Sequence, residues 1–486
     1  MRSIIIMMIA RLASSYILLP IHAQYPIFKD VNPFLVRLYS MRSFRCYSAP
    51  LPSAGSEKQK RIPKKFNPFP FEYHEELDVV VEDLTNLGVG VARHNLNDVE
   101  GVSSQWVIMI PLVLPGEKVR VRIFRNHASY SEADVLEILA SSPDRVDPRC
   151  PHFARCGGCQ YQHMNIDSQR EWKRMQVISV LERIGDIKNP FVSYTVGTHH
   201  EYGYRSKITP HYDTPRSSGL HPLRIGFQQR GTRNIIDIDK CIIASPKINE
   251  KYAEVRQEIR ERVAAAEAKP KKGATLLFRE ADDEYIETDN RKFITQTVNG
   301  TRFTFKAGEF FQNNPYVLAD MQRHVVQQAS EGSACKYLID AYCGSGLFAL
   351  SAAPLFQSVY GVEISELAVK ASSENAKQNS ISNAHFLCGA SEQIFSKVDH
   401  LPSGDTVIIL DPPRKGCDAS FLQQLFAFSP RKIVYVSCDP ATQARDAKVI
   451  LGTGRYEITN ITPFDLFPQT RHIENVITFI RRDNTY

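Results

Sequence analysis

Leu338-Ile-Asp-Ala-Tyr-Cys-Gly-Ser-Gly346 is the stretch that decides the fold, because a short apolar run leads directly into a Gly-x-Gly turn. Glycines let the backbone pass close to a nucleotide-type ligand, and the helix expected next would offer free amide groups. Glu363 ends the following apolar run, where its carboxylate can accept hydrogen bonds from ribose hydroxyls. Ala349 stands where a dinucleotide fingerprint would have its third glycine, which favours S-adenosylmethionine over a nicotinamide cofactor. The alternative is a strand, turn and helix with a structural role only.

The same rhythm continues from about residue 305 to the end of the chain. Helix-length segments at residues 362–382, 415–428 and 439–452 separate short apolar runs. These runs are Tyr337–Ile339, Ser358–Val362, Val407–Leu410, Ile433–Val436 and Val476–Ile480. Such alternation predicts a parallel α/β sheet that binds ligands at the carboxyl ends of its strands.

Two β-rich regions precede this part of the chain. The first has five short β-type runs, Leu77–Val81, Gly88–Ala92, Trp106–Ile110, Val119–Phe124 and Ala133–Leu139, which predict a small barrel of OB type. A structural β module with no nucleic-acid role is the alternative for it. Residues 190–300 predict a second, antiparallel β-rich region. An amphipathic helix is predicted between the two from the spacing of Trp172, Met175, Ile178 and Leu181.

The N-terminal segment differs in composition from the rest. The chain has 486 residues and a net charge of +6, and the first sixty residues, with eight Lys or Arg against two Asp or Glu, account for all of this charge. Bulk charge therefore argues nothing about a nucleic-acid partner. Scattered arginines and the absence of an acid before Asp30 predict a mitochondrial presequence, with a secretory signal or a cytosolic or nuclear tail as alternatives. The longest apolar run, Ile4–Ala10, is too short to span a bilayer.

Two motifs place reactive groups at strand ends. Asp411-Pro-Pro-Arg-Lys-Gly416 has Arg414 where enzymes that methylate amino groups usually have an aromatic residue, so amino-group methylation is disfavoured. Ile433-Val-Tyr-Val-Ser-Cys438 ends the next run with a cysteine, at the rim where this architecture places its chemistry. A buried cysteine without a role is the alternative for Cys438.

A cysteine at this rim suits methylation of carbon 5 of uracil. That carbon becomes nucleophilic only after a thiolate has added to carbon 6 of the ring. A base must then remove the carbon 5 proton. Glu474, in Arg471-His-Ile-Glu-Asn, is a candidate base, although taken alone it fits a surface carboxylate better, and His472 an ordinary loop histidine.

Four cysteines could bind a metal. Cys150, Cys156 and Cys159 are clustered around Gly157 and Gly158, and Cys241 lies further along the chain. Four thiolates can hold an iron–sulfur cluster or zinc, and the spacing also leaves open that no metal binds. The remaining cysteines are scattered, which fits a reducing compartment better than a disulfide framework.

Together these motifs resemble the RNA uracil-5-methyltransferase family from about Glu75 to the C-terminus. The motifs are Phe310-Phe-Gln-Asn-Asn-Pro315, Asp340-x-Tyr-Cys-Gly-x-Gly346, Asp411-Pro-Pro-Arg-Lys-Gly416, Ser437-Cys-Asp-Pro440 and His472-Ile-Glu-Asn475. The cysteine segment resembles that of the family's iron–sulfur members. Composition predicts a targeting segment and linker at 1–70, and the strand pattern a β-rich central domain at 143–304. The resemblance implies a TRAM-like OB barrel at 71–142 and a Rossmann-like class I methyltransferase domain at 305–486.

The resemblance also implies roles for individual residues. Cys438 would be the nucleophile and Glu474 the base that removes the carbon 5 proton. S-adenosylmethionine would be held by Gln312, Tyr342, Glu363 and Asp411, and a 4Fe-4S cluster by Cys150, Cys156, Cys159 and Cys241. One departure is Leu347, where many bacterial members have Asn.

The implied substrate is RNA, with no DNA or membrane partner. The chain resembles most the tRNA T-loop enzymes, which act at uridine 54, and an rRNA uridine is the alternative target. Two further alternatives are a noncatalytic RNA-binding or RNA-folding protein and a cytosine-5 methyltransferase that would use Cys417 as its second cysteine. Possible phosphate contacts are Arg205, Lys207, Arg230 and Arg233, each also consistent with solvated surface. The oligomeric state is left open.

Overall fold

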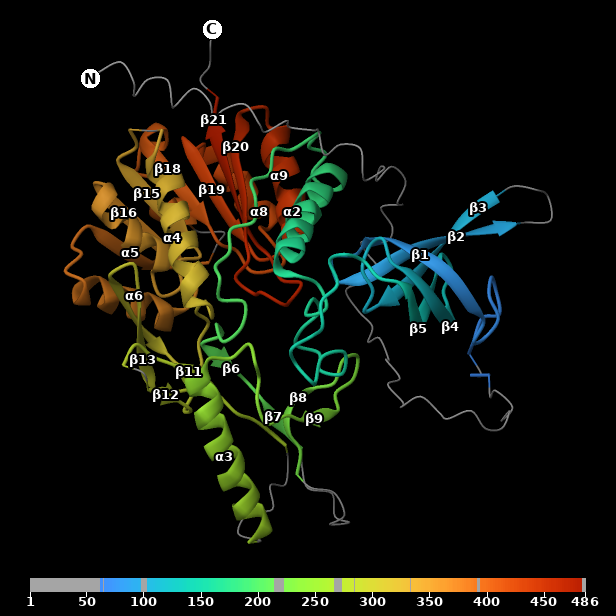
Figure 1. Cartoon of the computed structure of the whole chain (residues 1–486). Helices are drawn as coiled ribbons and strands as arrows, with labels where there is room; N and C mark the ends of the chain where they lie inside the picture. The colour runs from blue at the N-terminus through green and yellow to red at the C-terminus, as the bar shows by residue number, and fades with distance from the viewer. Residues whose placement is uncertain are drawn as a thin grey trace, which may run out of the picture. The chain divides into compact units, whose positions relative to one another are not determined.

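The computed structural model describes residues 62–63, 65–97, 103–213, 223–265, 273–283, 285–332, 334–390 and 394–482 (Figure 1). They belong to one compact unit, Phe44–Tyr486. Most of the predicted targeting segment and linker, residues 1–70, lies outside the described residues, as does Cys46. Within the described ranges, none of the helices combines the length and the apolar character that crossing a bilayer requires.

Residues 76–140 form a closed five-stranded barrel of the predicted OB type. Its strands are β1 (Glu76–Leu84), β2 (Val89–Asn97), β3 (Ser103–Pro111), β4 (Lys118–Asn126) and β5 (Tyr130–Ala140), in the spatial order β1-β2-β3-β5-β4. The barrel closes because β1 also pairs with β4, with Val79 opposite Val119. Alternate side chains of these two strands, Val81 and Val121 among them, fill the interior.

The predicted helix after the cysteine motif is α2 (Ile166–Arg183), but its buried face differs from the prediction. Its buried side chains are Gln169, Lys173, Gln176, Val177 and Leu181. Of the predicted apolar stripe Leu181 is buried, whereas Trp172, Met175 and Ile178 are half-buried, with Trp172 and Ile178 packed against core clusters. The stripe is therefore only partly correct, because polar side chains share the buried face. Gln169 and Lys173 bond to a loop from the distant C-terminal part of the chain, and Gln176 bonds to Thr85 and Tyr161.

The central region consists of small antiparallel sheets and one long helix. One sheet has the order β10-β7-β8-β9 (Ala274–Thr275, His211–Tyr212, Ile225–Gln228, Ile235–Asp237), and another β12-β11-β6 (Ile286–Glu287, Phe278–Glu280, Lys207–Ile208). A hairpin follows, β13 (Phe293–Val298) and β14 (Thr301–Lys306). The antiparallel prediction is confirmed, whereas helix α3 (Pro246–Ala264) was not expected. Only four of its nineteen residues are buried, Ile248 and Tyr252 among them, so its sequence lacks a continuous apolar stripe.

The C-terminal part is a seven-stranded sheet with helices on both faces (Figure 1). Its order is β17-β16-β15-β18-β19-β21-β20, comprising β17 (Ala384–Cys388), β16 (Ser358–Glu363), β15 (Tyr337–Ala341), β18 (Thr406–Leu410), β19 (Lys432–Ser437), β21 (Glu474–Arg481) and β20 (Tyr456–Phe464). The helices are α4 (Pro315–Ser330), α5 (Leu347–Ala352), α6 (Glu366–Gln378), α7 (Ile394–Lys397), α8 (Ala419–Phe428) and α9 (Pro440–Gly452). All five predicted strands are present, and β17 and β20 are additional.

The order of these strands determines where a ligand can bind. Strand β15 pairs in parallel with both β16 and β18. The order of the strands therefore reverses at β15, which leaves a crevice at its carboxyl end. Strand β21 runs antiparallel between β19 and β20. Its first residue, Glu474, therefore lies at the same edge of the sheet as the last residues of the parallel strands.

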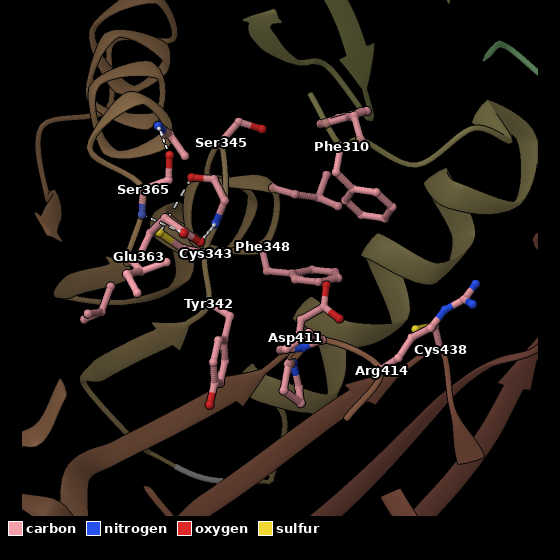
Figure 2. A pocket seen from close by; sticks show the side chains of 18 of the residues that line it. Phe310, Tyr342, Cys343, Ser345, Phe348, Glu363, Ser365, Asp411, Arg414 and Cys438 are labelled. Atoms are coloured by element: carbon pink, nitrogen blue, oxygen red, sulfur yellow. Dashed lines mark hydrogen bonds between the residues drawn. The ribbon is translucent and has the colours of Figure 1, made fainter. Parts of the chain in front are cut away.

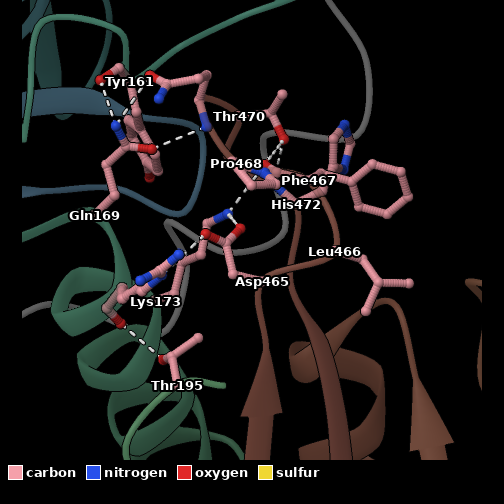
Figure 3. A network of polar contacts seen from close by, with 12 residues as sticks. Tyr161, Gln169, Lys173, Thr195, Asp465, Leu466, Phe467, Pro468, Thr470 and His472 are labelled. Atoms are coloured by element: carbon pink, nitrogen blue, oxygen red, sulfur yellow. Dashed lines mark hydrogen bonds and ion pairs between the residues drawn. The ribbon is translucent and has the colours of Figure 1, made fainter. Parts of the chain in front are cut away.

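A buried ion pair connects α2 to the loop that precedes Glu474 (Figure 3). The Lys173 ammonium donates to Asp465 Oδ1 at 2.6 Å and to the carbonyl oxygen of Phe467 at 3.2 Å. The side chain of Gln169 makes two hydrogen bonds with Gln469. Its Nε2 donates to Gln469 Oε1 at 3.0 Å, and its Oε1 accepts from the backbone N–H of Gln469 at 2.9 Å. Both charged side chains of the pair are fully buried, so the loop is fixed from one side by α2.

We expect K173M to lower the free energy of unfolding by about 3–5 kcal/mol, because it leaves the buried Asp465 carboxylate with only the more distant Arg170 guanidinium, at 3.7 Å, as a cation. K251M is the matched control, since Lys251 forms an exposed ion pair with Glu254 whose loss costs at most about 1 kcal/mol. Urea unfolding followed by circular dichroism measures both. A K173M protein as stable as K251M would contradict the prediction, and K173M/D465L, which removes both charges, should recover part of the loss.

Candidate active site

A cavity of about 750 Å³ lies at the carboxyl ends of the parallel strands (Figure 2). Its wall includes residues that directly follow three neighbouring strands, Tyr342 after β15, Asp411 after β18 and Cys438 after β19, and also Glu363, the last residue of β16. Gln312 and Glu474 complete the set of predicted site residues in this one cavity. The structure thus brings together all six residues that the sequence assigned to catalysis and cofactor binding.

The Gly-x-Gly turn forms one side of the cavity. Gly344 and Gly346 have φ values of +53° and +91°, in the left-handed region where residues with a Cβ are strained. A Cβ built on Gly344 would meet no atom within 4 Å, so the turn leaves open space where a ligand can approach the backbone. Asp340 lies beneath the turn and accepts a hydrogen bond from the Ala349 amide at 2.9 Å, which fixes the start of α5 rather than contacting a ligand.

Glu363 holds the turn in position. Its two carboxylate oxygens accept hydrogen bonds from the Gly344 amide at 3.2 Å and from the Ser365 amide at 2.9 Å. The same carboxylate lines the cavity, so its remaining lone pairs are available for the ribose hydroxyls predicted there. Leu347, the unusual residue at this turn, lines the cavity and packs against the hydrophobic core.

The loop that carries Gln312 is supported by two cations. The buried Arg279 guanidinium donates to the carbonyl oxygens of Glu309 at 2.9 Å and Phe311 at 3.3 Å. Lys207 donates to the carbonyl oxygens of Gly308 and Glu309, both at 3.2 Å. Burial, with the charges of Arg279 and Arg205, lowers the pKa of Lys207 to about 8.

These contacts affect the predicted RNA phosphate contacts. Lys207 supports the loop just described, the Arg205 guanidinium donates to the Lys207 carbonyl oxygen, and that of Arg230 donates to the Cys159 carbonyl oxygen. Arg233 is exposed. Three of the four predicted phosphate contacts therefore already serve the main chain, and their contact with RNA stays a prediction.

Cys438 and Glu474 lie side by side at the sheet edge. Ser437, the last residue of β19, lies opposite Asn475 of β21, so Cys438, which follows Ser437, and Glu474, which precedes Asn475, are neighbours. Glu474 is only 4% exposed, which excludes the alternative of a surface carboxylate. Burial raises its pKa well above the usual value, the nearby charge of Asp411 adds to this, and Arg414 opposes it. Burial likewise raises the pKa of Asp411 to about 7.

The thiol of Cys438 is protonated at neutral pH in the free protein. Burial raises its pKa to about 12, and the negative charges of Glu474 and Asp411 contribute. Arg414, through a hydrogen bond and its positive charge, lowers it. Figure 2 shows Arg414 and Cys438 together at one end of the cavity. Arg414 is therefore the group that favours the thiolate.

We expect the rate of alkylation of Cys438 by iodoacetamide to rise about tenfold per pH unit from pH 6 to pH 10 without a plateau, because only the thiolate reacts and its pKa lies above this range. R414M should give a lower rate at each pH. Mass spectrometry of the Cys438 peptide measures the rate. A plateau below pH 9 would show that the thiolate forms more readily than the surroundings of Cys438 imply.

The four cysteines predicted to bind metal are free thiols, and Cys159 is close enough to the other three for their charges to affect it. Burial raises the pKa of Cys159 to about 12, and the charges of Cys241, Cys156 and Cys150 add to it. Within the described part of the chain, however, no three His, Cys, Asp or Glu side chains lie in an arrangement that could hold a metal ion. The donor chemistry fits a four-thiolate centre, but the positions of the sulfurs do not yet form one.

The structure also adds residues that the sequence did not suggest. Lys173 and Arg279 are buried cations that hold loops of the site, and nothing in their local sequence distinguishes them from surface residues. Phe310 is 76% exposed at the cavity, within a motif that the sequence had singled out. Arg471 is part of the motif that contains Glu474, but nothing in the sequence indicated that its side chain lines a cavity.

The architecture and its cavity define a class of protein, a Rossmann-like methyltransferase preceded by a β-barrel. Models of the tRNA (uracil-5-)-methyltransferase family and of the TRAM domain match residues 242–482 and 71–136, respectively. The chain belongs to the tRNA (uracil-5-)-methyltransferase family, on the strength of the first match and of the relatives described next.

Similar proteins include two fungal enzymes and one archaeal structure. The tRNA (uracil(54)-C(5))-methyltransferase of Schizosaccharomyces pombe is 40% identical over 85% of this chain and 79% of its own length. The tRNA (uracil(54)-C(5))-methyltransferase of Saccharomyces cerevisiae is 34% identical over 84% of this chain and 74% of its own length. The crystal structure of Pyrococcus abyssi tRNA (uracil-54, C5)-methyltransferase in complex with S-adenosyl-L-homocysteine matches with a TM-score of 0.62 at 24% identity, covering 83% of this chain and 100% of that one, which supports the fold.

Proposed function

We propose that this protein transfers a methyl group from S-adenosylmethionine to carbon 5 of uridine 54 in the T-loop of tRNA, through a covalent adduct with Cys438. The observation that carries the proposal is the placement of Cys438 and Glu474 side by side in the cavity that also contains the Gly-x-Gly turn. Neither residue would need this placement in a noncatalytic RNA-binding protein.

The cavity suits S-adenosylmethionine, which supplies an electrophilic methyl group when bound. The open space at Gly344 accommodates a nucleotide-type ligand, and the Glu363 carboxylate can accept hydrogen bonds from ribose hydroxyls. Gln312, Tyr342 and Asp411 line the same cavity and are the other residues proposed to hold it.

The protein's own residues account for the remaining steps. The thiolate of Cys438 adds to carbon 6 of the uracil ring, which makes carbon 5 an enolate carbon that can take the methyl group. Glu474 then removes the proton from carbon 5, and the electron pair left there expels the thiolate from carbon 6. Only the ionised carboxylate of Glu474 can accept this proton, and the positive charge of Arg414 favours that form against the effect of burial. The target base must leave its stack to reach this depth.

The alternative of cytosine-5 methylation is disfavoured by the position of its second cysteine. Cys417 is only 5% exposed and does not line the cavity. Its sulfur contacts the Tyr435 hydroxyl at 3.8 Å, and its amide donates to Asp446 Oδ2 at 2.8 Å. The other thiol in the described wall of the cavity, Cys343, belongs to the turn after β15 and not to the loop after β18 that carries Asp411.

Nucleoside mass spectrometry of separated tRNA and rRNA pools, from cells with and without this protein, tests the proposal. Loss of 5-methyluridine from tRNA, restored by the wild-type gene and not by C438A, is the expected result. Loss from rRNA alone would assign the alternative substrate. Unchanged pools, together with no covalent trapping by 5-fluorouridine RNA, would favour the noncatalytic alternative.

We also propose that Cys150, Cys156, Cys159 and Cys241 bind a 4Fe-4S cluster. The support is the donor chemistry of four free thiols, of which Cys159 is affected by the charges of the other three. Iron, acid-labile sulfide and zinc measured on anaerobically purified protein test this. A brown protein with about four irons per chain is expected, whereas stoichiometric zinc or no metal would refute the cluster.

The location of the protein in the mitochondrial matrix is a further proposal, supported only by the basic N-terminal segment. Measuring the loss of 5-methyluridine separately in mitochondrial and cytosolic tRNA tests it. Loss from cytosolic tRNA alone would favour the cytosol or nucleus.

A further inference from the structure

A second, smaller cavity lies next to Cys438. Its volume is about 150 Å³, and it shares Cys438 and Arg414 with the larger cavity. Its wall also contains Asp439, Arg471 and His472, together with Asn86 from the turn between β1 and β2 of the barrel. Cys438 is thus reached from two cavities, one with the proposed cofactor residues and one lined largely by polar side chains.

The charges in this second cavity favour an anion. Arg414 and Arg471 are its two cations, and the Arg471 guanidinium makes no hydrogen bond or ion pair with any described residue. The only acid in the wall, Asp439, accepts hydrogen bonds through Oδ1 from the amides of Ala441 at 3.0 Å and Thr442 at 3.2 Å, as the N-cap of α9. Burial and the neighbouring cations lower the pKa of His472 to about 4, so it is neutral at pH 7.

The wall of this cavity is built from fixed segments. The Arg471 amide donates to Gln160 Oε1 at 3.2 Å, and the amides of Gln160 and Tyr161 donate to the Gln469 carbonyl oxygen, both at 3.0 Å. On the barrel side, Gln176 of α2 donates to the Thr85 carbonyl oxygen at 3.3 Å, next to Asn86. An arginine held on such a segment loses little conformational entropy when it binds a ligand.

We infer that the smaller cavity binds a phosphate group of the RNA backbone next to the target uridine, with Arg471 as its principal contact. This inference rests on the proposed function, because it places the target base in the larger cavity against Cys438. The volume is well below the roughly 300–1,000 Å³ of pockets for drug-sized ligands, so a small group rather than a nucleoside fits. Two guanidinium groups match a phosphate in charge and in geometry.

The test uses a tRNA T-arm hairpin with a single neutral methylphosphonate at one of the two phosphates flanking the target uridine. For one of these positions, wild-type protein should bind the modified hairpin about tenfold or more weakly than the native one. R471Q should bind the native hairpin as weakly as wild-type protein binds the modified one. Its affinity for the modified hairpin should be no lower still. The magnitude of its salt-dependence slope should fall by about 0.7–0.9, as for the loss of one phosphate contact.

Two arginine variants serve as controls. R323Q removes an arginine on α4 that is 64% exposed and paired with Asp320, so its affinity for the hairpin should equal that of the wild type. R471K keeps the charge without the planar guanidinium and should recover part of the affinity. Partial recovery by R471K indicates an electrostatic contact rather than a structural defect of R471Q.

The outcomes separate this inference from the proposed function. Covalent trapping of wild-type protein by a 5-fluorouridine hairpin tests the chemistry, and its absence would refute the proposed function whatever Arg471 does. If wild-type protein is trapped but R471Q and the methylphosphonate weaken hairpin binding additively, the phosphate contact is refuted and the proposed function stands. Binding that responds to competing inorganic phosphate through Arg471, but not to either methylphosphonate, would assign the cavity to a free anion and overturn the inference.

Discussion

C438A is expected to transfer no measurable methyl group to tRNA and to form no covalent complex with RNA that carries 5-fluorouridine. Wild-type protein should be trapped on that RNA, because after methylation the fluorine on carbon 5 cannot be removed as a proton is, and the thiol stays bound to carbon 6. Without the sulfur no enolate forms, so the rate should fall by about 10⁴-fold or more. Methyl transfer from radiolabelled S-adenosylmethionine and denaturing gel electrophoresis measure the two effects.

The matched control for this variant is C335A. Cys335 is a partly exposed cysteine outside the cavity, whose sulfur lies 4.0 Å from the Gly404 carbonyl oxygen and which packs at the edge of the core, so its loss should leave both activities unchanged. If C438A kept turnover within tenfold of the wild type, Cys438 would not be the nucleophile.

E474Q should behave differently, because it blocks a later step. The amide cannot accept the carbon 5 proton, so ordinary tRNA should accumulate as a methylated covalent adduct while multiple turnover falls by about 10²–10⁴-fold. Burial raises the pKa of Glu474, and the neutral amide resembles the protonated carboxyl in size and charge. We therefore expect E474Q to fold with wild-type stability.

The control here is E457Q on β20, since Glu457 is 55% exposed and paired with Arg482 outside the cavity. It should neither slow turnover nor accumulate an adduct. An E474Q protein that turned over normally would assign proton removal to another group. An E474Q protein that formed no adduct at all would show that Glu474 is needed at or before the addition of the thiol rather than after it.

The parts of the fold that local sequence determines were predictable. Strands β15, β16, β18 and β19 are short apolar runs, and their reactive residues follow each run directly, so the rim of the cavity could be predicted without coordinates. Strand β20 was missed because its sequence, Tyr-Glu-Ile-Thr-Asn-Ile-Thr-Pro-Phe, mixes polar residues and a proline into the pattern. As the edge strand of the sheet it tolerates both.

The features that could not be predicted depend on contacts between distant parts of the chain. Lys173 looks like a surface residue of a helix until Asp465, far along the sequence, is placed beside it. Glu474 was indistinguishable from a surface acid because its burial follows from the antiparallel insertion of β21 between β19 and β20. The buried polar side chains of α2 likewise depend on a distant segment, because Gln169 and Lys173 bond to residues 465–469.

The ion pair between Lys173 and Asp465 also bears on how the protein folds. Its partners are 292 positions apart in the chain, and those of the Gln169–Gln469 bond are 300 apart. Closing such long loops costs entropy before any contact is gained, and chains of this size fold through intermediates. An intermediate can therefore contain most of the helices and strands while the loop before Glu474 is still detached from α2. Catalytic competence would then be acquired last, after the bulk of the secondary structure has formed.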